Sequence, residues 1–394
     1  MAFLVEEVRN LKDVDEILTS LKGSCPEEES LFRGYEWQKA WCETFGVGKK
    51  IRFLKVSEDS QPIALFPLIV SREYRRPWFS LHHVYKDDLQ FLSSKCKIAC
   101  VLPVNQLSIA ANIQSGTVRG GWHVKAGREE KALSALLDYL RKKKDWDVIV
   151  LPGIPSEEAA LYRQVLNREG LPFYVNPEKR PLFSLTVKSW EEYFAGRKRH
   201  FRTRFKTAIK ELQRMGEVRS CTVTSKEDVA EALSALFALG HKSWKERPRT
   251  GSSFYLPLTD QTKAFYSRLA ELYLERELCA VHQVFVDDVL AASMFSIREN
   301  GRLFTLQTFY APEFAKASPG RFLMKETIDW SANNGIKQID FNGNSSIVRL
   351  MSKESAQYCQ VLVFSNRLYS RIIYKCMQFV DKVKNRLGST DPRE

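Results

Sequence analysis

The segment RLFTLQTFYAPEFAKASPGRFLMKETIDWSANNGIKQIDF, residues 302–341, carries the pattern that decides the fold of this chain. RLFTLQTFY and KQIDF predict strands, and between them residues 316–320 predict a turn and residues 321–333 a helix. A helix that starts directly after a tight turn leaves its first N–H groups unpaired and exposes the positive end of its dipole. The segment therefore predicts an anion site at the turn.

Two interpretations of this turn remain open from the residues alone. In the first, Pro319 sets the backbone, Gly320 lets a ligand approach closely, and Arg321 adds a positive charge. In the second, Ser318 only caps the helix, with Pro319 at its first position. The spacing fits neither G-x-x-x-x-G-K-[ST] nor G-x-G-x-x-G, so it does not support a nucleoside triphosphate or dinucleotide site.

Length and composition predict two globular domains in a protein with anionic partners. The chain has 394 residues, 44% of them hydrophobic, and a net charge of +13. Its eight cysteines contain no C-x-x-C pair, so we expect reduced thiols and no structural metal. The sequence shows neither a signal peptide nor 18 consecutive apolar residues, which predicts a cytoplasmic location.

The chain divides into two halves of similar pattern. Each half has a predicted hairpin, and each later passes from a helix through a buried strand to a glycine turn. The polar segment 176–182 is the best linker, which gives domains at 1–175 and 183–394. The second begins with a strongly basic helix at 197–216 and ends with an amphipathic helix rich in Lys and Arg.

The order of motifs resembles the GNAT acyltransferase superfamily, in its double-domain branch. The matching pieces are FRGYEW (32–37), RKRHFRTRFKTAIKEL (197–212), LFALGHKSWKERPRTGSSF (236–254), SPGRFLMKETIDWSANNG (318–335) and IDFNG (339–343). This branch includes acetyltransferase-like proteins associated with cellulose biosynthesis and, more distantly, Fem-type aminoacyl transferases. The resemblance implies an α+β fold of two tandem GNAT-like domains, each a mixed central sheet flanked by helices.

The resemblance also implies a reaction, N-acyl transfer from an acyl-CoA to an amine by direct attack. It assigns the phosphates of the donor to the turn formed by Ser318, Gly320, Arg321 and Phe322. The family's loop reads Q/R-x-x-G-x-G/A, whereas Ala317 and Phe322 stand at two of its key places here. This departure leaves room for a protein that has kept the fold and lost the chemistry.

Three residues are candidates for the chemistry. His241 has a side chain whose usual pKa suits a general base at neutral pH, and Asp340 follows a buried strand, where α/β sheets place ligands. Each also has a structural alternative, as a core or capping histidine and as a turn cap. Tyr358, just before the last strand, is the candidate that protonates the leaving thiolate, with a strand aromatic as its alternative.

Four residues are candidates for binding the acceptor. Trp244 lies three residues after His241 and so shares its helix face, and Asn342 follows Asp340. Arg33 and Trp37 lie within FRGYEW.

The sequence leaves several partners open. The acceptor is a small-molecule, saccharide or peptide amine. The basic helix 197–212 fits the 3′-phosphate of coenzyme A or, as an alternative donor, a charged tRNA. The terminal helix either docks on its own domain or lies on an acidic membrane surface. We expect no DNA partner and no metal cofactor. The third functional alternative is an inactive accessory protein of polysaccharide assembly.

Overall fold

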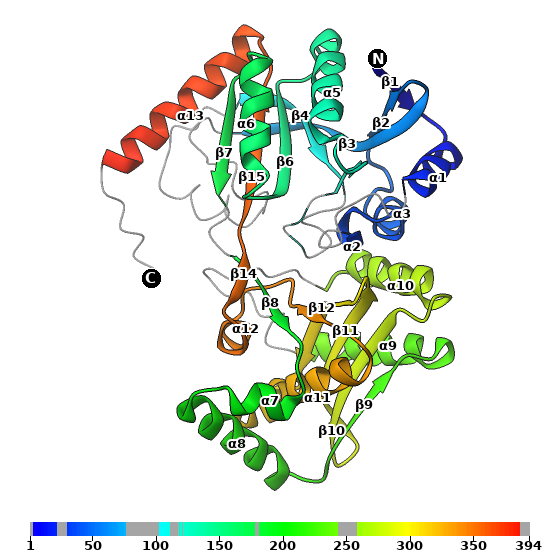
Figure 1. The fold of residues 1–394 in the computed structure, drawn as a ribbon, viewed down its shortest axis with the longest axis vertical. Coiled ribbons are helices and arrows are strands. Elements are labelled where there is room, and N and C mark those ends of the chain that lie inside the picture. Colours follow the sequence, from blue (N-terminus) through cyan, green and yellow to red (C-terminus); the bar gives the residue numbers. More distant parts are fainter. Residues whose placement is uncertain are drawn as a thin grey trace.

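The chain folds into two mixed sheets flanked by helices, which confirms the α+β class (Figure 1). The computed structural model describes residues 3–21, 30–75, 102–110, 117, 119, 121–177, 181–242 and 258–386. The two sheets lie one above the other along the longest axis of the molecule in Figure 1.

The N-terminal sheet has the strand order β1-β2-β3-β4-β6-β15-β7, with β5 paired to β3. Its strands are β1 (Phe3–Val8), β2 (Ile51–Glu58), β3 (Gln61–Arg75), β4 (Leu102–Ile109), β5 (His123–Val124), β6 (Val148–Pro155), β7 (Phe173–Pro177) and β15 (Tyr358–Phe364). The helices of this half are α1 (Leu11–Ser20), α2 (Ser30–Arg33), α3 (Tyr35–Thr44), α5 (Glu129–Lys143), α6 (Ala159–Arg168) and α13 (Leu368–Arg386).

The C-terminal sheet has the order β14-β8-β13-β12-β11-β10-β9. Its strands are β8 (Leu182–Thr186), β9 (Val218–Val223), β10 (Cys279–Val286), β11 (Val289–Glu299), β12 (Arg302–Tyr310), β13 (Gln338–Asp340) and β14 (Glu354–Ala356). Its helices are α7 (Trp190–Ala195), α8 (Arg199–Arg214), α9 (Lys226–Lys242), α10 (Asp260–Leu274), the 3₁₀ helix η4 (Pro312–Ala317), α11 (Pro319–Asn333) and α12 (Ser346–Met351).

The two sheets have the same strand order, and the N-terminal sheet receives one strand, β15, from the C-terminal half. β15, near the C-terminus, lies between β6 and β7 of the N-terminal sheet, and β8 lies between β13 and β14 of the C-terminal sheet. The sequence-based boundary, with all of 183–394 in one domain, therefore differs from the structure at β15 and α13. The reason is physical: every residue of β15 is buried, which identifies a central strand but not the sheet that receives it.

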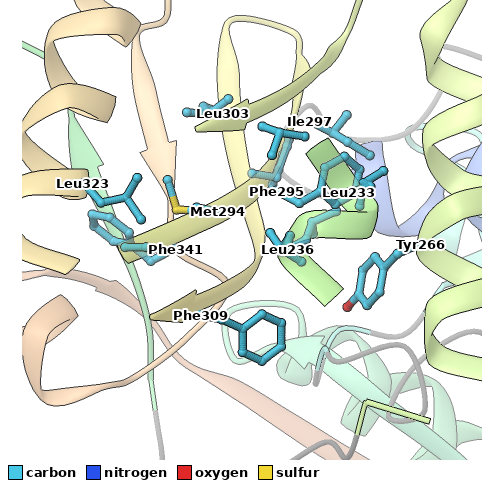
Figure 2. Close-up of a cluster of buried hydrophobic side chains, with 14 of the residues drawn as sticks. Leu233, Leu236, Tyr266, Met294, Phe295, Ile297, Leu303, Phe309, Leu323 and Phe341 are labelled. Carbon is cyan, nitrogen blue, oxygen red and sulfur yellow. The ribbon is translucent and has the colours of Figure 1, made fainter. Parts of the chain in front are cut away.

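The core of the C-terminal half follows from alternation along β11. Figure 2 shows Met294 on the side of Leu323 and Phe341, and Phe295 on the side of Leu233 and Leu236. Leu323 comes from α11, whereas Leu233 and Leu236 come from α9. Helices thus cover both faces of this sheet.

One buried core also joins the two halves. Phe32 of α2 packs edge-on against Phe304 of β12, with ring centroids 5.6 Å apart, and Trp37 of α3 packs against Phe265 of α10 at 5.0 Å. Aromatic pairs in this geometry stabilise contacts beyond their buried area. Trp37 has no exposed surface. Its side chain therefore packs between the halves and is not accessible to an acceptor.

Because β15 is a central strand of the N-terminal sheet, a substitution in its buried side chains is expected to destabilise the N-terminal half. Leu362 of β15 is fully buried, and Leu362→Ala is expected to lower the free energy of unfolding by about 2–5 kcal/mol. Leu368→Ala, four residues after β15 at a side chain that is 76% exposed, is the matched control and should cost less than about 0.5 kcal/mol. Urea denaturation measures both, and equal losses would contradict the burial of β15.

Two buried histidines, one in each half, link stability to pH. Burial lowers the pKa of His282 on β10 to about 3, and its Nδ1 lies 2.9 Å from Thr222 Oγ1. Burial likewise lowers the pKa of His123 on β5 to about 4. An unfolded histidine has a pKa near 6.5, so below this pH the unfolded chain binds protons that the folded chain rejects.

The free energy of unfolding is therefore expected to fall as the pH is lowered from about 6.5 towards 4. Each histidine contributes a decrease of up to about 1.4 kcal/mol per pH unit. These histidines contribute no such change above about pH 7. His282→Gln should reduce the loss of unfolding free energy between pH 7 and pH 5 in urea titrations. The control is His200→Gln, at an exposed position of α8. An unchanged loss in the His282 variant would contradict its buried, neutral state.

Candidate functional site

The candidate site lies where β12 and β13 separate. The two strands pair in parallel from Arg302 with Gln338 to Phe304 with Asp340. β13 ends there, whereas β12 continues to Tyr310 and leads through η4 into α11. The carboxyl ends of both strands and the start of α11 therefore lie toward the same edge of the sheet, which is where α/β sheets bind ligands.

The turn at the start of α11 leaves room for an anion. Ser318 has left-handed backbone angles (φ 54°, ψ 57°), Pro319 stands at the first helical position, and the Ser318 side chain makes no capping hydrogen bond. Beside Gly320, an added Cβ would meet no atom within 4 Å, so the backbone there faces open space. The first turn of α11 carries no acidic residue. The Ser318 side chain therefore does not cap α11, and the backbone of this turn is open towards a ligand.

Two arginines add positive charge to this turn. Arg321 donates a hydrogen bond from Nη1 to the carbonyl oxygen of Arg204 on α8, at 3.1 Å. Burial and the charge of Arg204 lower the pKa of Arg321. Among the described residues neither guanidinium forms an ion pair. A bound anion would relieve this repulsion.

The equivalent turn of the N-terminal half has the opposite character. There, β4 and β6 pair in parallel, and α5 begins after the connection that follows β4. Glu129 and Glu130 occupy the first turn of α5. Carboxylates at a helix start already complement its dipole and repel a phosphate. Of the two equivalent helix starts, as far as the described residues show, the one in the C-terminal half is therefore the better suited to an anion.

A buried ion pair joins the halves beside the site. Arg119 Nη2 lies 2.7 Å from Asp340 Oδ2, and the two side chains are 3% and 4% exposed. Asp340 Oδ1 accepts a hydrogen bond from the backbone N–H of Asn342 at 2.8 Å. Asn342 Oδ1 in turn accepts one from Thr117 Oγ1 at 2.9 Å. Residues of the N-terminal half thus fix the end of β13.

The guanidinium of Arg119 also contacts two aromatic rings. It lies 4.7 Å from the ring centre of Phe32 and 5.3 Å from that of Tyr358. Three candidates from the sequence, Asp340, Asn342 and Tyr358, are therefore brought together around one arginine. Arg33 follows Phe32 directly, and its Nη2 lies 3.6 Å from Glu158 Oε1.

This geometry changes what Asp340 can do. Both of its oxygens have partners and its side chain is buried, so an acceptor has little access to it. We therefore assign it a positioning part at the end of β13, held by Arg119.

His241 has a different environment. It lies exposed in the last turn of α9. A Cβ added to the preceding residue, Gly240, would lie 3.1 Å from the Phe309 ring of β12. This end of α9 therefore packs closely against the part of β12 that extends past the residues paired with β13. Trp244 falls in segment 243–257, outside the described residues.

Two residues of the site escaped the sequence-based prediction: Arg119 and Thr117. Arg119 and Thr117 follow no helical or strand periodicity, and their partners lie more than 200 positions away. One signal was available in Gly121, where a Cβ would come within 2.5 Å of the Phe32 carbonyl oxygen and the Gln38 side chain. A glycine at such a close approach marks tight packing against α2 and α3.

The described residues contain neither a cluster of candidate metal ligands nor a helix that could span a membrane. Among these residues no group of three or more His, Cys, Asp or Glu side chains is placed to hold a metal ion. In the part of the chain that the structure describes, no helix is both long and apolar enough to cross a membrane.

Comparison with known proteins supports the fold. Residues 199–347 match the family model described as an acetyltransferase (GNAT) domain. No curated protein matches the chain by sequence. The structure is similar to that of FemX, with a TM-score of 0.54 and 10% identity over 95% of this chain and 100% of that one. It is also similar to a conserved protein of unknown function from Bacteroides thetaiotaomicron, with a TM-score of 0.52 and 10% identity over 91% of this chain and 100% of that one.

The buried pair yields a stability prediction. Arg119→Met leaves the Asp340 carboxylate buried without its counter-charge, which should cost about 3–5 kcal/mol of unfolding free energy. Arg214→Met breaks an exposed pair with Glu211 and should cost no more than about 1 kcal/mol. The double variant Arg119→Met with Asp340→Leu is expected to regain much of the loss. Urea denaturation of the full chain decides, and equal costs for the two single variants would contradict the buried pair.

Proposed function

We propose that the protein is an acyltransferase of the GNAT type, with an acyl-CoA as its donor and an amine as its acceptor. Residues 199–347 match the model of an acetyltransferase (GNAT) domain, which supports this proposal. The observation that carries it is the start of α11 at residues 318–322, with its open backbone and two arginines that form no ion pair with the described residues. Fold alone does not fix a donor, whereas positive charge at an open helix start suits a phosphate.

The proposed donor fits the turn chemically. The pyrophosphate of coenzyme A is a dianion, and the start of α11 offers N–H groups and a positive dipole end. Ser318, Gly320, Arg321 and Phe322 form the turn, and Gly320 borders the open space. The thioester would extend along β12, where that strand continues past Asp340.

The proposed reaction is a direct attack. The acceptor nitrogen forms a bond to the thioester carbonyl carbon, the carbon–sulfur bond breaks, and the sulfur leaves as a thiolate. His241 takes the proton from the acceptor amine, since it is exposed at the end of α9 beside β12. Tyr358 supplies the proton that the thiolate needs. Arg119 and Asp340 hold the end of β13 in place, and much of the rate would come from this positioning.

The acceptor is a small-molecule, saccharide or peptide amine. Asn342 and Arg33 are its proposed contacts at the junction of the halves, together with Trp244. The proposal is consistent with a cytoplasmic location, where acyl-CoA is available.

A second donor, charged tRNA, is favoured by one observation. α8 packs beside η4 and α11, and it carries a series of exposed cations: Arg199, Arg202, Arg204, Lys206 and Arg214. Its apolar face, which includes Phe201 and Phe205, is buried. This surface suits a phosphate backbone, but the two phenylalanines offer no stacking platform for bases.

The decisive experiment compares ligands by thermal shift. Acetyl-CoA at about 100 times its Kd should stabilise the wild type by about 2.7 kcal/mol and raise the Tm. Gly320→Val should abolish this shift while leaving the unliganded Tm nearly unchanged, since position 320 has ordinary backbone angles and open space. Long-chain acyl-CoA and charged tRNA are the parallel ligands.

The outcomes separate the alternatives. If charged tRNA is the only ligand that stabilises the protein, and if its effect depends steeply on salt, the donor is charged tRNA and not acyl-CoA. Stabilisation by none of the three ligands would favour an accessory protein without this chemistry. If acetyl-CoA raises the Tm of the Gly320→Val variant as it does that of the wild type, the phosphates bind elsewhere than at the turn.

A further inference from the structure

The outer face of α13 is an unusual surface for this protein. The inner face of the helix packs Ile373 and Met377 into a small core with Phe364 of β15. Ser370, also on this side, hydrogen bonds to Asp147 at 3.2 Å. The helix is therefore docked on the N-terminal half, and its opposite face is left outward.

That opposite face is apolar. Leu368, Ile372 and Phe379 are 76%, 48% and 68% exposed, and positions i, i+4 and i+11 lie on one side of a helix. They are three of the eight large hydrophobic side chains that are exposed among the described residues. Scattered exposed hydrophobics are ordinary, but three on one helix face form a continuous surface.

Positive charge lies directly beside these side chains. Arg371 and Lys375 are both exposed. Arg371, three positions after Leu368, falls on the adjoining side of the helix, and Lys375, seven positions after Leu368, lies on the same side as the three apolar residues. Arg371 hydrogen bonds to Asn366, and neither cation forms an ion pair with the described residues. Between Leu368 and Phe379 the sequence contains no acidic residue.

We propose that this outer face of α13 binds the surface of a lipid bilayer that contains acidic lipids. An amphipathic helix of this kind lies in the plane of the interface, with its apolar side chains among the acyl chains and its cations at the lipid phosphates. The complementary charge, together with the net charge of +13, favours this occupant over a neutral surface. The surface of a single projecting helix is convex, so it can lie against a flat membrane.

The position of α13 makes this binding compatible with ligand binding elsewhere. Figure 1 shows α13 at the upper end of the molecule and α8 and α11 at the lower end of its longest axis. Membrane contact at α13 would therefore leave the turn at 318–322 accessible. The inference does not depend on which donor the turn binds.

Vesicle co-sedimentation of the full chain tests the proposal. The wild type should sediment with phosphatidylcholine vesicles that contain phosphatidylglycerol, should not sediment with phosphatidylcholine alone, and should lose binding in high salt. The triple variant Leu368→Gln, Ile372→Gln and Phe379→Gln should reduce partitioning about tenfold or more. Arg371→Gln with Lys375→Gln should weaken binding and its dependence on salt.

A matched control uses exposed hydrophobic residues elsewhere. Val47, Met215 and Val289 are 68%, 44% and 48% exposed, and their replacement by Gln should leave binding unchanged. Unchanged Tm values would show that all variants fold. No wild-type binding to acidic vesicles, equal loss in the control, or full binding by the α13 triple variant would each overturn the proposal. A dimer in analytical ultracentrifugation that the α13 variant abolishes would also overturn it, by assigning the face to a second copy.

Discussion

The insertion of β15 into the N-terminal sheet is the constraint on which the rest of the structure depends. This sheet is completed by a strand from the other half of the chain, because β15 lies between β6 and β7. A central strand hydrogen bonds on both sides, so the N-terminal half cannot complete its sheet alone. The halves are thereby fixed against each other, and side chains from one can shape a site in the other.

The buried pair of Arg119 and Asp340 shows what this arrangement allows. Two charges can be buried together only when their geometry is held and their remaining groups are occupied. The Asn342 amide and the rings of Phe32 and Tyr358 provide these contacts, and they come from both halves. The N-terminal half therefore contributes to the candidate site by holding its edge, although its own equivalent turn repels anions.

The asymmetry between the halves follows from a few charges. Both halves place a helix after a strand of a parallel pair, but α5 starts with two glutamates and α11 with Pro319, Gly320 and Arg321. The same backbone therefore has opposite electrostatic character at its two equivalent points. Two sheets of the same strand order thus carry opposite charge patterns at their equivalent helix starts.

The sequence by itself determined the local elements and their order. Periodicity predicted α8 and α11 to within a few residues, and the hairpin turn of the C-terminal half, at Asp287 and Asp288, has the positive φ angles that it requires. The sequence also predicted a turn before α11, because that signal lies within consecutive residues. Only the tertiary structure decided which sheet receives β15, and that Arg119 holds Asp340. Those outcomes depend on contacts between residues far apart in the chain, and no local pattern records which of several compatible partners a strand or a charge will meet.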